Sequence, residues 1–343
     1  MKFLRLAFYV LIAQLVLSGC AGEGVEETSS SEINFDAYLG RNASTRAGVT
    51  NIASLKKSGF GVFARYNHNG ATSSLMDNER VTWNGDRWGY TNTRYWPNEG
   101  SVDFYAFAPY LKNVELVNAP DSIKDNPTCI EFTSSTSPVD LVWDVQKNKT
   151  VPTSSTDGKV KFVFKHALAR LGFDITANQE LEENGAVIKV DSVKLYGDTI
   201  VNGAFDIKGY LNLENGGWSR PKDNTRVVYT WTPTGAEDGT NFKLSASQLD
   251  HTCSKIENAP NSYLCIIPQE KWVAFYLQIT YTVQQGTFKE EVKVKKNLLD
   301  VRKQPGVSNP SFPFEKGKAY VFHLILSLDP INFYVTTTVV DWK

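Results

Sequence analysis

The residues that decide the fold class are 275–295, with the sequence FYLQITYTVQQGTFKEEVKVK. The first half alternates apolar side chains with mostly polar ones, and Gln285-Gly286 then turns the chain. In the second half, Val292 and Val294 alternate with lysines. Because successive side chains of a β-strand point to opposite faces of a sheet, this pattern predicts a half-buried antiparallel hairpin.

The same two-residue period recurs along the chain. The apolar positions of four further segments are Phe60, Val62, Ala64 and Tyr66; Val160, Phe162 and Phe164; Tyr320, Phe322, Leu324 and Leu326; and Ile331, Phe333, Val335, Thr337 and Val339. Helical periodicity is confined to residues 51–59, a short segment that Asn51 can cap and Gly59 can end. Many short strands separated by Gly, Pro, Asn and Asp predict an all-β fold of antiparallel β-sandwiches.

The length predicts two domains. About 320 residues remain after the leader described below, which is room for roughly two domains. Residues 178–185 are polar and acidic and lie near the middle of the chain. We place the boundary there, which gives an N-terminal β-sandwich over residues 47–177 and a C-terminal β-sandwich over residues 178–343.

Residues 1–20 have the form of a lipoprotein signal peptide. Lys2 and Arg5 precede an apolar run that leads to Leu17-Ser18-Gly19-Cys20. The run is too short to span a bilayer as a mature helix, and small residues before a cysteine fit a lipoprotein signal peptidase. We expect a lipid on Cys20, export, and anchoring in the outer membrane. An ordinary secretory leader that happens to contain a cysteine is the alternative.

Residues 21–46 are expected to form a tether, a removable first strand and a cleavage site. Four apolar side chains would share one face of that strand: Ile33, Phe35, Ala37 and Leu39. The polar loop after the strand contains Arg46-Ala47, a basic site for proteolysis, and Arg41 is a second possible cleavage point. This order suggests a precursor that is cut before it assembles.

Composition and motifs argue against several other classes of protein. The chain has 36 basic and 37 acidic residues and a net charge of −1, so we expect no nucleic-acid partner. No segment matches the motifs of serine hydrolases, zinc proteases or phosphate-binding loops, and no Cys/His spacing fits zinc. We therefore expect no catalytic site, no metal and no cofactor.

Three cysteines remain besides Cys20. Cys253 and Cys265 flank a loop that contains Pro260-Asn261, whereas Cys129 lies far away in the sequence. Cys253 and Cys265 could form a disulfide in an oxidising compartment. Three buried thiols are the alternative.

An aromatic cluster between residues 83 and 96 supports a second candidate function. Its members are Trp83, Trp88, Tyr90, Tyr95 and Trp96. Apolar ring faces beside polar side chains are what sugar binding requires, so a glycan-binding surface lipoprotein is the alternative function. If the rings instead close a sandwich, they will be buried, so their exposure distinguishes the two interpretations.

Five motifs resemble the fimbrillin family, the subunits of type V pili made by Gram-negative anaerobes, and they occur in the family's order. They are Phe35-Asp36-Ala37-Tyr38 with Ser44-Thr45-Arg46-Ala47; residues 55–64, LKKSGFGVFA; Tyr95-Trp96-Pro97 with residues 102–109, VDFYAFAP; residues 164–171, FKHALARL; and Gly317-Lys318-Ala319-Tyr320 with Asp341-Trp342. Together they extend over almost the whole chain after the leader.

The resemblance implies a fold and a route of assembly. The fold would be two tandem transthyretin-like β-sandwich domains, and the subunit would reach the cell surface as a lipoprotein. A trypsin-like, Arg-specific protease would then cut at Arg46-Ala47 and remove the first strand. A C-terminal strand of a neighbouring subunit would fill the open groove.

The C-terminal run that starts at Ile331 is the candidate donor strand, because it is β-branched, aromatic and poorly charged. The alternative is that it forms the last strand of its own sandwich. We expect a stalk or tip subunit of a pilus that mediates adhesion. Its partners would be other fimbrillin subunits, the Arg-specific protease, and glycans or proteins on host or bacterial surfaces.

Overall fold

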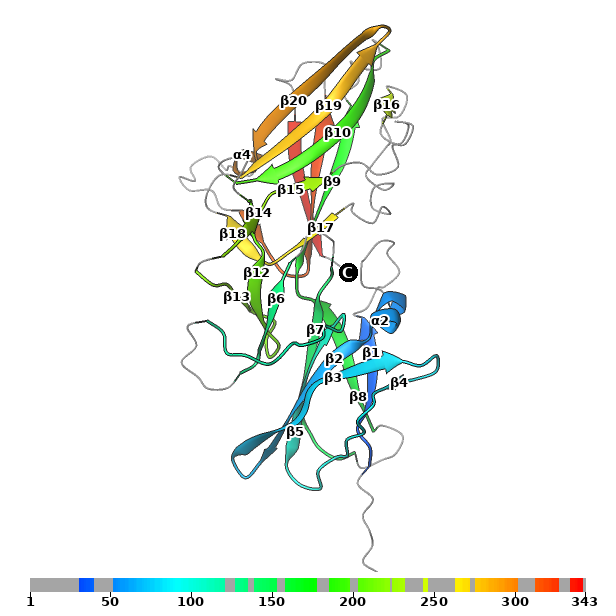
Figure 1. Ribbon diagram of the computed structural model, residues 1–343, viewed down its shortest axis with the longest axis vertical. Helices are drawn as coiled ribbons and strands as arrows, with labels where there is room; N and C mark the ends of the chain where they lie inside the picture. The colour runs from blue at the N-terminus through cyan, green and yellow to red at the C-terminus, as the bar shows by residue number, and fades with distance from the viewer. Residues whose placement is uncertain are drawn as a thin grey trace, which may run out of the picture.

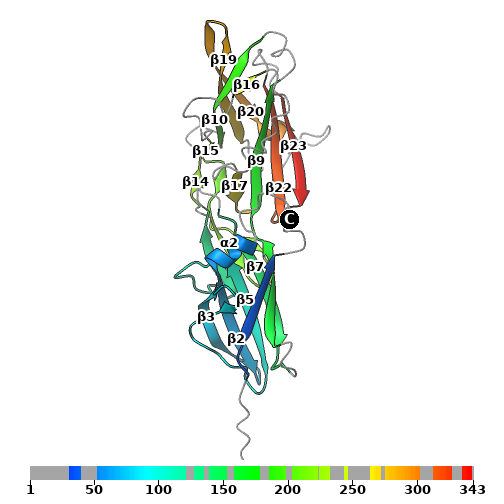
Figure 2. The same cartoon turned by 90° about the vertical axis from the view of Figure 1, so that its right-hand side faces the viewer.

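The computed structural model describes residues 31–39, 52–120, 127–134, 139–152, 158–177, 185–197, 203–222, 224–231, 243–245, 263–271, 275–301, 312–326 and 334–341. The expected features outside these ranges are Cys20, Arg41, Arg46-Ala47, Cys253, Ile331 and Phe333. The described residues form an elongated molecule built almost entirely of strands, so the fold is all-β (Figures 1 and 2). Within these ranges, no helix has both the length and the apolar character needed to cross a membrane.

A seven-stranded sheet forms one end of the molecule, in the order β1-β8-β7-β5-β2-β3-β4. Its strands are β1 (Asn34–Leu39), β2 (Phe60–His68), β3 (Ala71–Trp83), β4 (Trp88–Gly89), β5 (Ser101–Ala108), β7 (Val142–Lys149) and β8 (Lys159–His166). The two ends of this sheet approach each other, because the chain just before β1 bonds to the chain just after β4. The Ile33 N–H donates to the Arg94 carbonyl at 2.8 Å, and the Trp96 N–H donates to the Ser31 carbonyl at 3.0 Å. The sheet therefore curls around its own apolar core, and β1 closes it.

The expected short helix is present as α2 (Ile52–Ser58), with Leu55 fully buried beneath it. Gly59 ends the helix with a φ of +70°, and its N–H donates to the Leu55 carbonyl at 2.8 Å. A side chain at Gly59 would also collide with the Val81 carbonyl, since an added Cβ would lie 2.5 Å from that oxygen. The glycine is thus required both by its positive φ and by its close contact with β3.

Three small sheets lie along the middle of the molecule (Figure 1). One has the order β13-β12-β6, and the other two pair β11 with β14 and β18 with β21. Their bounds are β6 (Cys129–Thr133), β11 (Phe205–Asp206), β12 (Lys208–Asn212), β13 (Trp218–Ser219), β14 (Arg226–Val227), β18 (Gln269–Lys271) and β21 (Phe312–Phe314). Since β6 pairs with β12, strands from the two halves of the sequence share a sheet.

Two larger sheets build the other end of the molecule. Their orders are β15-β10-β19-β20, with β16 paired to β10, and β17-β9-β22-β23. Their bounds are β9 (Ala169–Ala177), β10 (Val187–Tyr196), β15 (Tyr229–Trp231), β16 (Lys243–Ser245), β17 (Tyr263–Ile266), β19 (Tyr276–Gln285), β20 (Phe288–Asn297), β22 (Lys318–Leu326) and β23 (Tyr334–Asp341), and α4 (Leu298–Val301) follows β20. The hairpin predicted over residues 275–295 is confirmed as β19–β20, with Tyr281 opposite Val292 and Gly286 in its turn.

β9 shows where the chain passes from one end of the molecule to the other. It pairs in parallel with β22 and antiparallel with β17, whereas β8, directly before it, belongs to the seven-stranded sheet. An N-terminal unit over residues 47–177 would cut the sheet that contains β9 and β22. The pairing therefore favours a boundary at Ala167 and Leu168, ahead of the expected residue 178.

Buried apolar residues gather in three clusters. The N-terminal core lies inside the seven-stranded sheet and includes Phe35, Phe60, Phe104 and Phe162. A second cluster covers the opposite face of the same sheet, and the third fills the space around β10, β19 and β22. The second cluster contains Phe63, Phe107 and Trp143 together with Phe132 and Leu211 from β6 and β12. It joins the two ends of the molecule through a continuous apolar contact.

Candidate functional site

β1 occupies an edge of the seven-stranded sheet and runs parallel to β8 (Figure 2). The register places Asn34 opposite Lys159 and Leu39 opposite Phe164. β1 and β8 are far apart in the sequence, so β1 is held by this single strand ladder, by contacts near Arg94 and Trp96, and by its side chains. A strand placed in this way can be exchanged without breaking the interior of the sheet.

One face of β1 is buried in the N-terminal core. The exposed fractions of Ile33, Phe35 and Ala37 are 1%, 2% and 3%, and Leu39 packs half-buried against the same core. These four side chains contribute on the order of 6 kcal/mol of hydrophobic stabilisation before the entropy cost of ordering the strand. The structure thus places the expected face of β1 inward.

The Phe35 ring sits in a pocket made of four aromatic rings, which we call the Phe35 socket. The ring centroids lie 6.3 Å from Phe60, 5.4 Å from Tyr90, 6.0 Å from Phe104 and 5.8 Å from Phe162. Phe162 stacks on Phe35, whereas Phe60 and Phe104 approach it edge-on. Such ring pairs stabilise an aromatic side chain in the socket by more than its buried area alone would give.

Tyr90 also holds the backbone of the chain at the start of β1. Its hydroxyl donates to the Ile33 carbonyl at 2.7 Å and accepts from the Arg94 N–H at 3.1 Å. Burial raises the pKa of the Tyr90 phenol above its ordinary value, so the hydroxyl keeps the proton that it donates. The sequence groups Tyr90 with the aromatic cluster but does not indicate this role, because a contact to the backbone leaves no periodic signal.

The outer face of β1 is polar and open to solvent. Tyr38 is 47% exposed, and its hydroxyl donates to the Asp36 carboxylate at 2.9 Å. On the neighbouring strand, Val163 lies opposite Tyr38 and is 44% exposed. The buried apolar side chains of β1 therefore lie on its inner face.

The candidate donor strand is paired within its own chain as β23. It lies at the edge of its sheet, antiparallel to β22, with Val335 opposite Leu324, Thr337 opposite Phe322 and Val339 opposite Tyr320. This pairing is what the alternative interpretation, a last strand of its own sandwich, predicts. An edge strand can leave its sheet by breaking one ladder, so a donor role stays a proposal.

The aromatic cluster at residues 83–96 does not form an exposed platform. Trp88 and Trp96 are buried, with exposed fractions of 5% and 3%, and both belong to the N-terminal core. Trp83 packs edge-on against Trp88, and only Tyr95 is mainly exposed, at 51%. The exposure criterion therefore favours rings that close the sandwich over rings that bind sugar.

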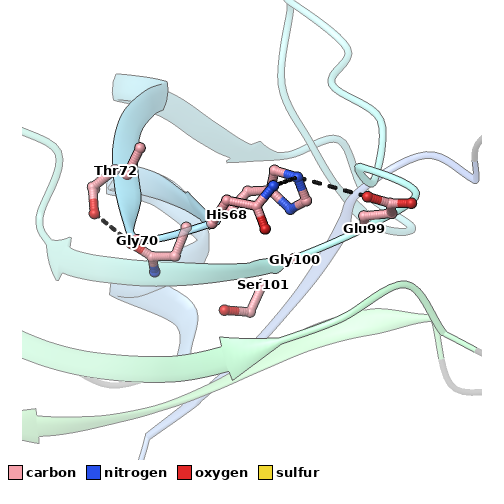
Figure 3. Close-up of a pocket in the computed structure, with 9 residues that line it drawn as sticks. His68, Gly70, Thr72, Glu99, Gly100 and Ser101 are labelled. Carbon is pink, nitrogen blue, oxygen red and sulfur yellow. Dashed lines mark hydrogen bonds and ion pairs between the residues drawn. The ribbon is translucent and has the colours of Figure 1, made fainter.

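A second candidate site is an open polar hollow where the β2–β3 turn approaches the start of β5 (Figure 3). The His68 imidazole lies 3.6 Å from the Glu99 carboxylate, and the Thr72 hydroxyl donates to the Asn67 side chain at 2.7 Å. The Tyr66 ring stacks on His68 with centroids 5.9 Å apart, which covers one face of the imidazole. The hollow offers polar groups that already pair with one another, so we do not take it as the functional site.

Cys265 is a free, buried thiol. Cys253 lies outside the described residues, so the possible disulfide between the two stays a prediction. Cys265 lies in β17 and is 3% exposed, and Cys129 is likewise a free thiol at 2%. Burial raises the pKa of the Cys265 thiol well above its ordinary value. A thiol that is both buried and protonated reacts slowly.

We therefore expect Cys265 to resist alkylation in the folded chain. Iodoacetamide at pH 8 should label the Cys265 peptide in 6 M urea but leave it almost unlabelled without denaturant, and peptide mass spectrometry measures both fractions. The Cys129 peptide provides an internal comparison, since that thiol is equally buried. A Cys253–Cys265 linked peptide in the unreduced digest would contradict the free thiol.

A match to a protein-family model shows the family of this chain. A family model described as fimbrillin-like matches residues 45–342, which is most of the sequence. The chain belongs to the fimbrillin-like family. The residues that carried the resemblance, from 55–64 to the C-terminal Gly317-Lys318-Ala319-Tyr320, lie inside this match. The matched region begins next to Arg46 and leaves out β1.

Known relatives of this fimbrillin-like chain are distant in sequence but similar along its full length. The fimbrium subunit Fim1C of Phocaeicola vulgatus is 23% identical over 97% of this chain and 95% of its own. A fimbrial protein from Bacteroides vulgatus has a TM-score of 0.60 at 22% identity, covering 91% of this chain and 99% of its own. A candidate cell adhesion protein from Bacteroides uniformis has a TM-score of 0.52 at 17% identity, with the same coverage of the two chains. These structures show that the fold is shared.

Proposed function

We propose that this fimbrillin-like chain is a subunit of a cell-surface pilus and that it assembles by exchange of β1. In this scheme Cys20 carries the lipid during export to the outer membrane, and a trypsin-like, Arg-specific protease cuts at Arg46-Ala47. The cut releases the tether and β1, and a strand from a neighbouring subunit fills the groove. The relatives named as fimbrial proteins support the pilus role.

The observation that carries the proposal is the one-sided burial of β1. Its inner face fills the N-terminal core, while among the described strands it forms a ladder with β8 alone. Loss of β1 would leave the edge of β8 unpaired and the Phe35 socket empty. An unpaired edge beside exposed apolar surface is a template for another strand, so the trimmed subunit would gain stability by taking one up.

The position of the cleavage site agrees with this scheme. Arg46 follows β1 and precedes α2, so a cut there separates β1 from every other described element of the fold. Residues 33, 35 and 37 would leave together, because residue 33 directly precedes β1 and the other two lie in it. The family match starts at residue 45, which also fits a mature subunit without β1.

Mass spectrometry of the subunit released from the cell surface tests the proposal. We expect a mature N-terminus at Ala47 and no lipid-modified Cys20 peptide in the assembled fraction. The precursor in the membrane fraction should still contain residues 31–46, which gives the matched comparison. A surface form that retains a lipid on Cys20 would refute cleavage and indicate an anchored lipoprotein.

A further inference from the structure

We propose that the outer face of strands β10, β19 and β20 binds an acidic polysaccharide, a polymer whose sugars carry carboxylate or sulfate groups. The three strands lie side by side at the end of the molecule far from the seven-stranded sheet (Figure 1). The surface, which we call the lysine face, is defined by five lysines: Lys189, Lys194, Lys289, Lys293 and Lys295. It lies away from β1, so binding to it does not depend on the strand exchange proposed above.

The strand register gathers these lysines on one face of the sheet. Lys194 and Lys295 lie on either side of Gln278, and Lys293 lies opposite Thr280 on the neighbouring strand. Side chains of a strand alternate between the two faces, and the apolar ones of the same strands point the other way. They belong to the buried cluster around β10, β19 and β22: Ile188, Val193, Leu277, Ile279 and Val294. Burial of that face therefore holds the lysines toward solvent.

The lysine face has an excess of positive charge. Among the ion pairs of the described ranges, the only one that includes a lysine of this face joins Lys293 to Glu291 at 2.7 Å. The other acid on the face is Asp191, whose carboxylate accepts a hydrogen bond from the Thr282 hydroxyl at 2.8 Å. Two carboxylates thus stand against five lysines, although the whole chain has a net charge of −1. Such a local excess attracts a polyanion.

Protection of an open sheet edge does not account for these lysines. Lysine side chains on an edge strand discourage pairing with other chains, and β20 lies at the edge of its sheet. Lys189 and Lys194 lie instead on β10, which pairs with β19 on one side and with β15 and β16 on the other. Their charges protect no edge, so a role in contact with a partner explains them better.

Lys295 is held in place by two aromatic rings. Its ammonium group lies 4.0 Å from the centroid of the Tyr276 ring and 5.7 Å from that of Tyr196, and the two rings stack on each other. Contacts between a cation and the face of a ring restrict the positions that the ammonium can take. Less conformational freedom is then lost when the ammonium binds an anion, which favours binding.

The spacing and the uncharged side chains of the face favour a polysaccharide. Lys194 and Lys295 are separated by two strand spacings, or about 10 Å, which suits a polymer with recurring charges better than one compact anion. Gln278 and Gln284 lie among the lysines and can both donate and accept hydrogen bonds, as sugar hydroxyls do. β10, β19 and β20 contain no arginine, the residue that fits phosphate with paired hydrogen bonds, which argues against a nucleic acid.

Binding of the purified precursor to immobilised polymers tests this proposal. The probes are polygalacturonate, which carries carboxylates, dextran sulfate, which carries sulfates, and uncharged dextran. We expect binding to an acidic polymer that weakens with added salt, and no binding to dextran. The variant Lys194→Gln/Lys295→Gln should bind about tenfold more weakly, as the loss of two exposed ion pairs predicts. Lys194→Arg/Lys295→Arg keeps both charges and should retain most of the affinity.

The matched control is Lys112→Gln/Lys159→Gln, which removes the same charge from exposed positions outside the lysine face. Its affinity for the acidic polymer should equal that of the wild type. Unfolding in denaturant checks that each variant is folded, and the single variants Lys194→Gln and Lys295→Gln supply the measurement if the double variant is unstable.

Three results would overturn the proposal. The first is an equal loss of affinity in the control variant, or none in a folded lysine-face variant. The second is that neither acidic polymer binds. The third is tighter binding to duplex DNA, or to vesicles of phosphatidylglycerol and phosphatidylcholine in equal parts, because the partner would then belong to another class. The assay needs neither cleavage nor assembly, so its outcome is separate from that of the proposed function.

Discussion

Arg46→Ala is expected to abolish assembly of the subunit while leaving its export and folding intact. Without the cut, β1 stays tethered to its own groove, and Phe35 keeps the socket filled. A strand on a short tether competes at an effective concentration in the millimolar range, far above that of a neighbouring subunit. We expect polymer on the cell surface to fall by about two orders of magnitude or more.

Arg41→Ala is the matched control for this experiment. Arg41 lies in the same segment between β1 and α2, but we expect it to be uncut and its loss to leave assembly unchanged. Unboiled samples on denaturing gels measure the ladder of assembled subunits, and electron microscopy counts the pili. Normal ladders from Arg46→Ala cells would refute the cleavage step, and loss of assembly only in Arg41→Ala would move the site to Arg41.

The sequence predicts best those strands that have one face in a core and one in solvent. β1 and β19, the first strand of the predicted hairpin, both fit this description, and most of their alternating apolar positions are buried. β2 is different, because Phe60 and Val62 face the N-terminal core while Phe63 faces the second cluster. Its outer face is covered by β6 and β12, which come from distant parts of the sequence. No local pattern indicates such a covering layer.

Pairing between distant strands also explains why the sequence does not indicate where one part of the fold passes into the next. The polar stretch at residues 178–185 separates β9 from β10, and these strands belong to the two sheets that build the same end of the molecule. β9 pairs with β22, which lies more than a hundred residues later, and only the folded structure reveals which strand β9 pairs with.

For the candidate site, the alternation in the sequence indicates which side chains of β1 face inward. The contact of Tyr90 with Ile33 depends instead on where a loop folds back, which the sequence does not indicate.

Phe35→Ala is expected to destabilise the uncut chain by about 3–5 kcal/mol, the usual cost of removing a buried phenylalanine. The loss combines the burial of the ring with an empty cavity among Phe60, Phe104 and Phe162. Unfolding of the purified precursor in denaturant measures this change. Tryptophan fluorescence can report the unfolding, because Trp88 and Trp96 lie in the same core. If the free energy of unfolding depends on denaturant concentration with the same slope in both proteins, the substitution has changed only stability.

Tyr38→Ala provides the comparison on the same strand. Tyr38 faces solvent and loses only its bond to Asp36, so we expect a change below about 1 kcal/mol. Equal losses in the two variants would contradict the one-sided burial of β1.

The two variants also test the exchange, since both side chains leave with β1. Pili assembled from Phe35→Ala precursor should resist heat in detergent as well as wild-type pili do. Pili weakened by Phe35→Ala would mean that β1 remains in the mature subunit, because a strand that has been removed cannot affect the stability of the filament.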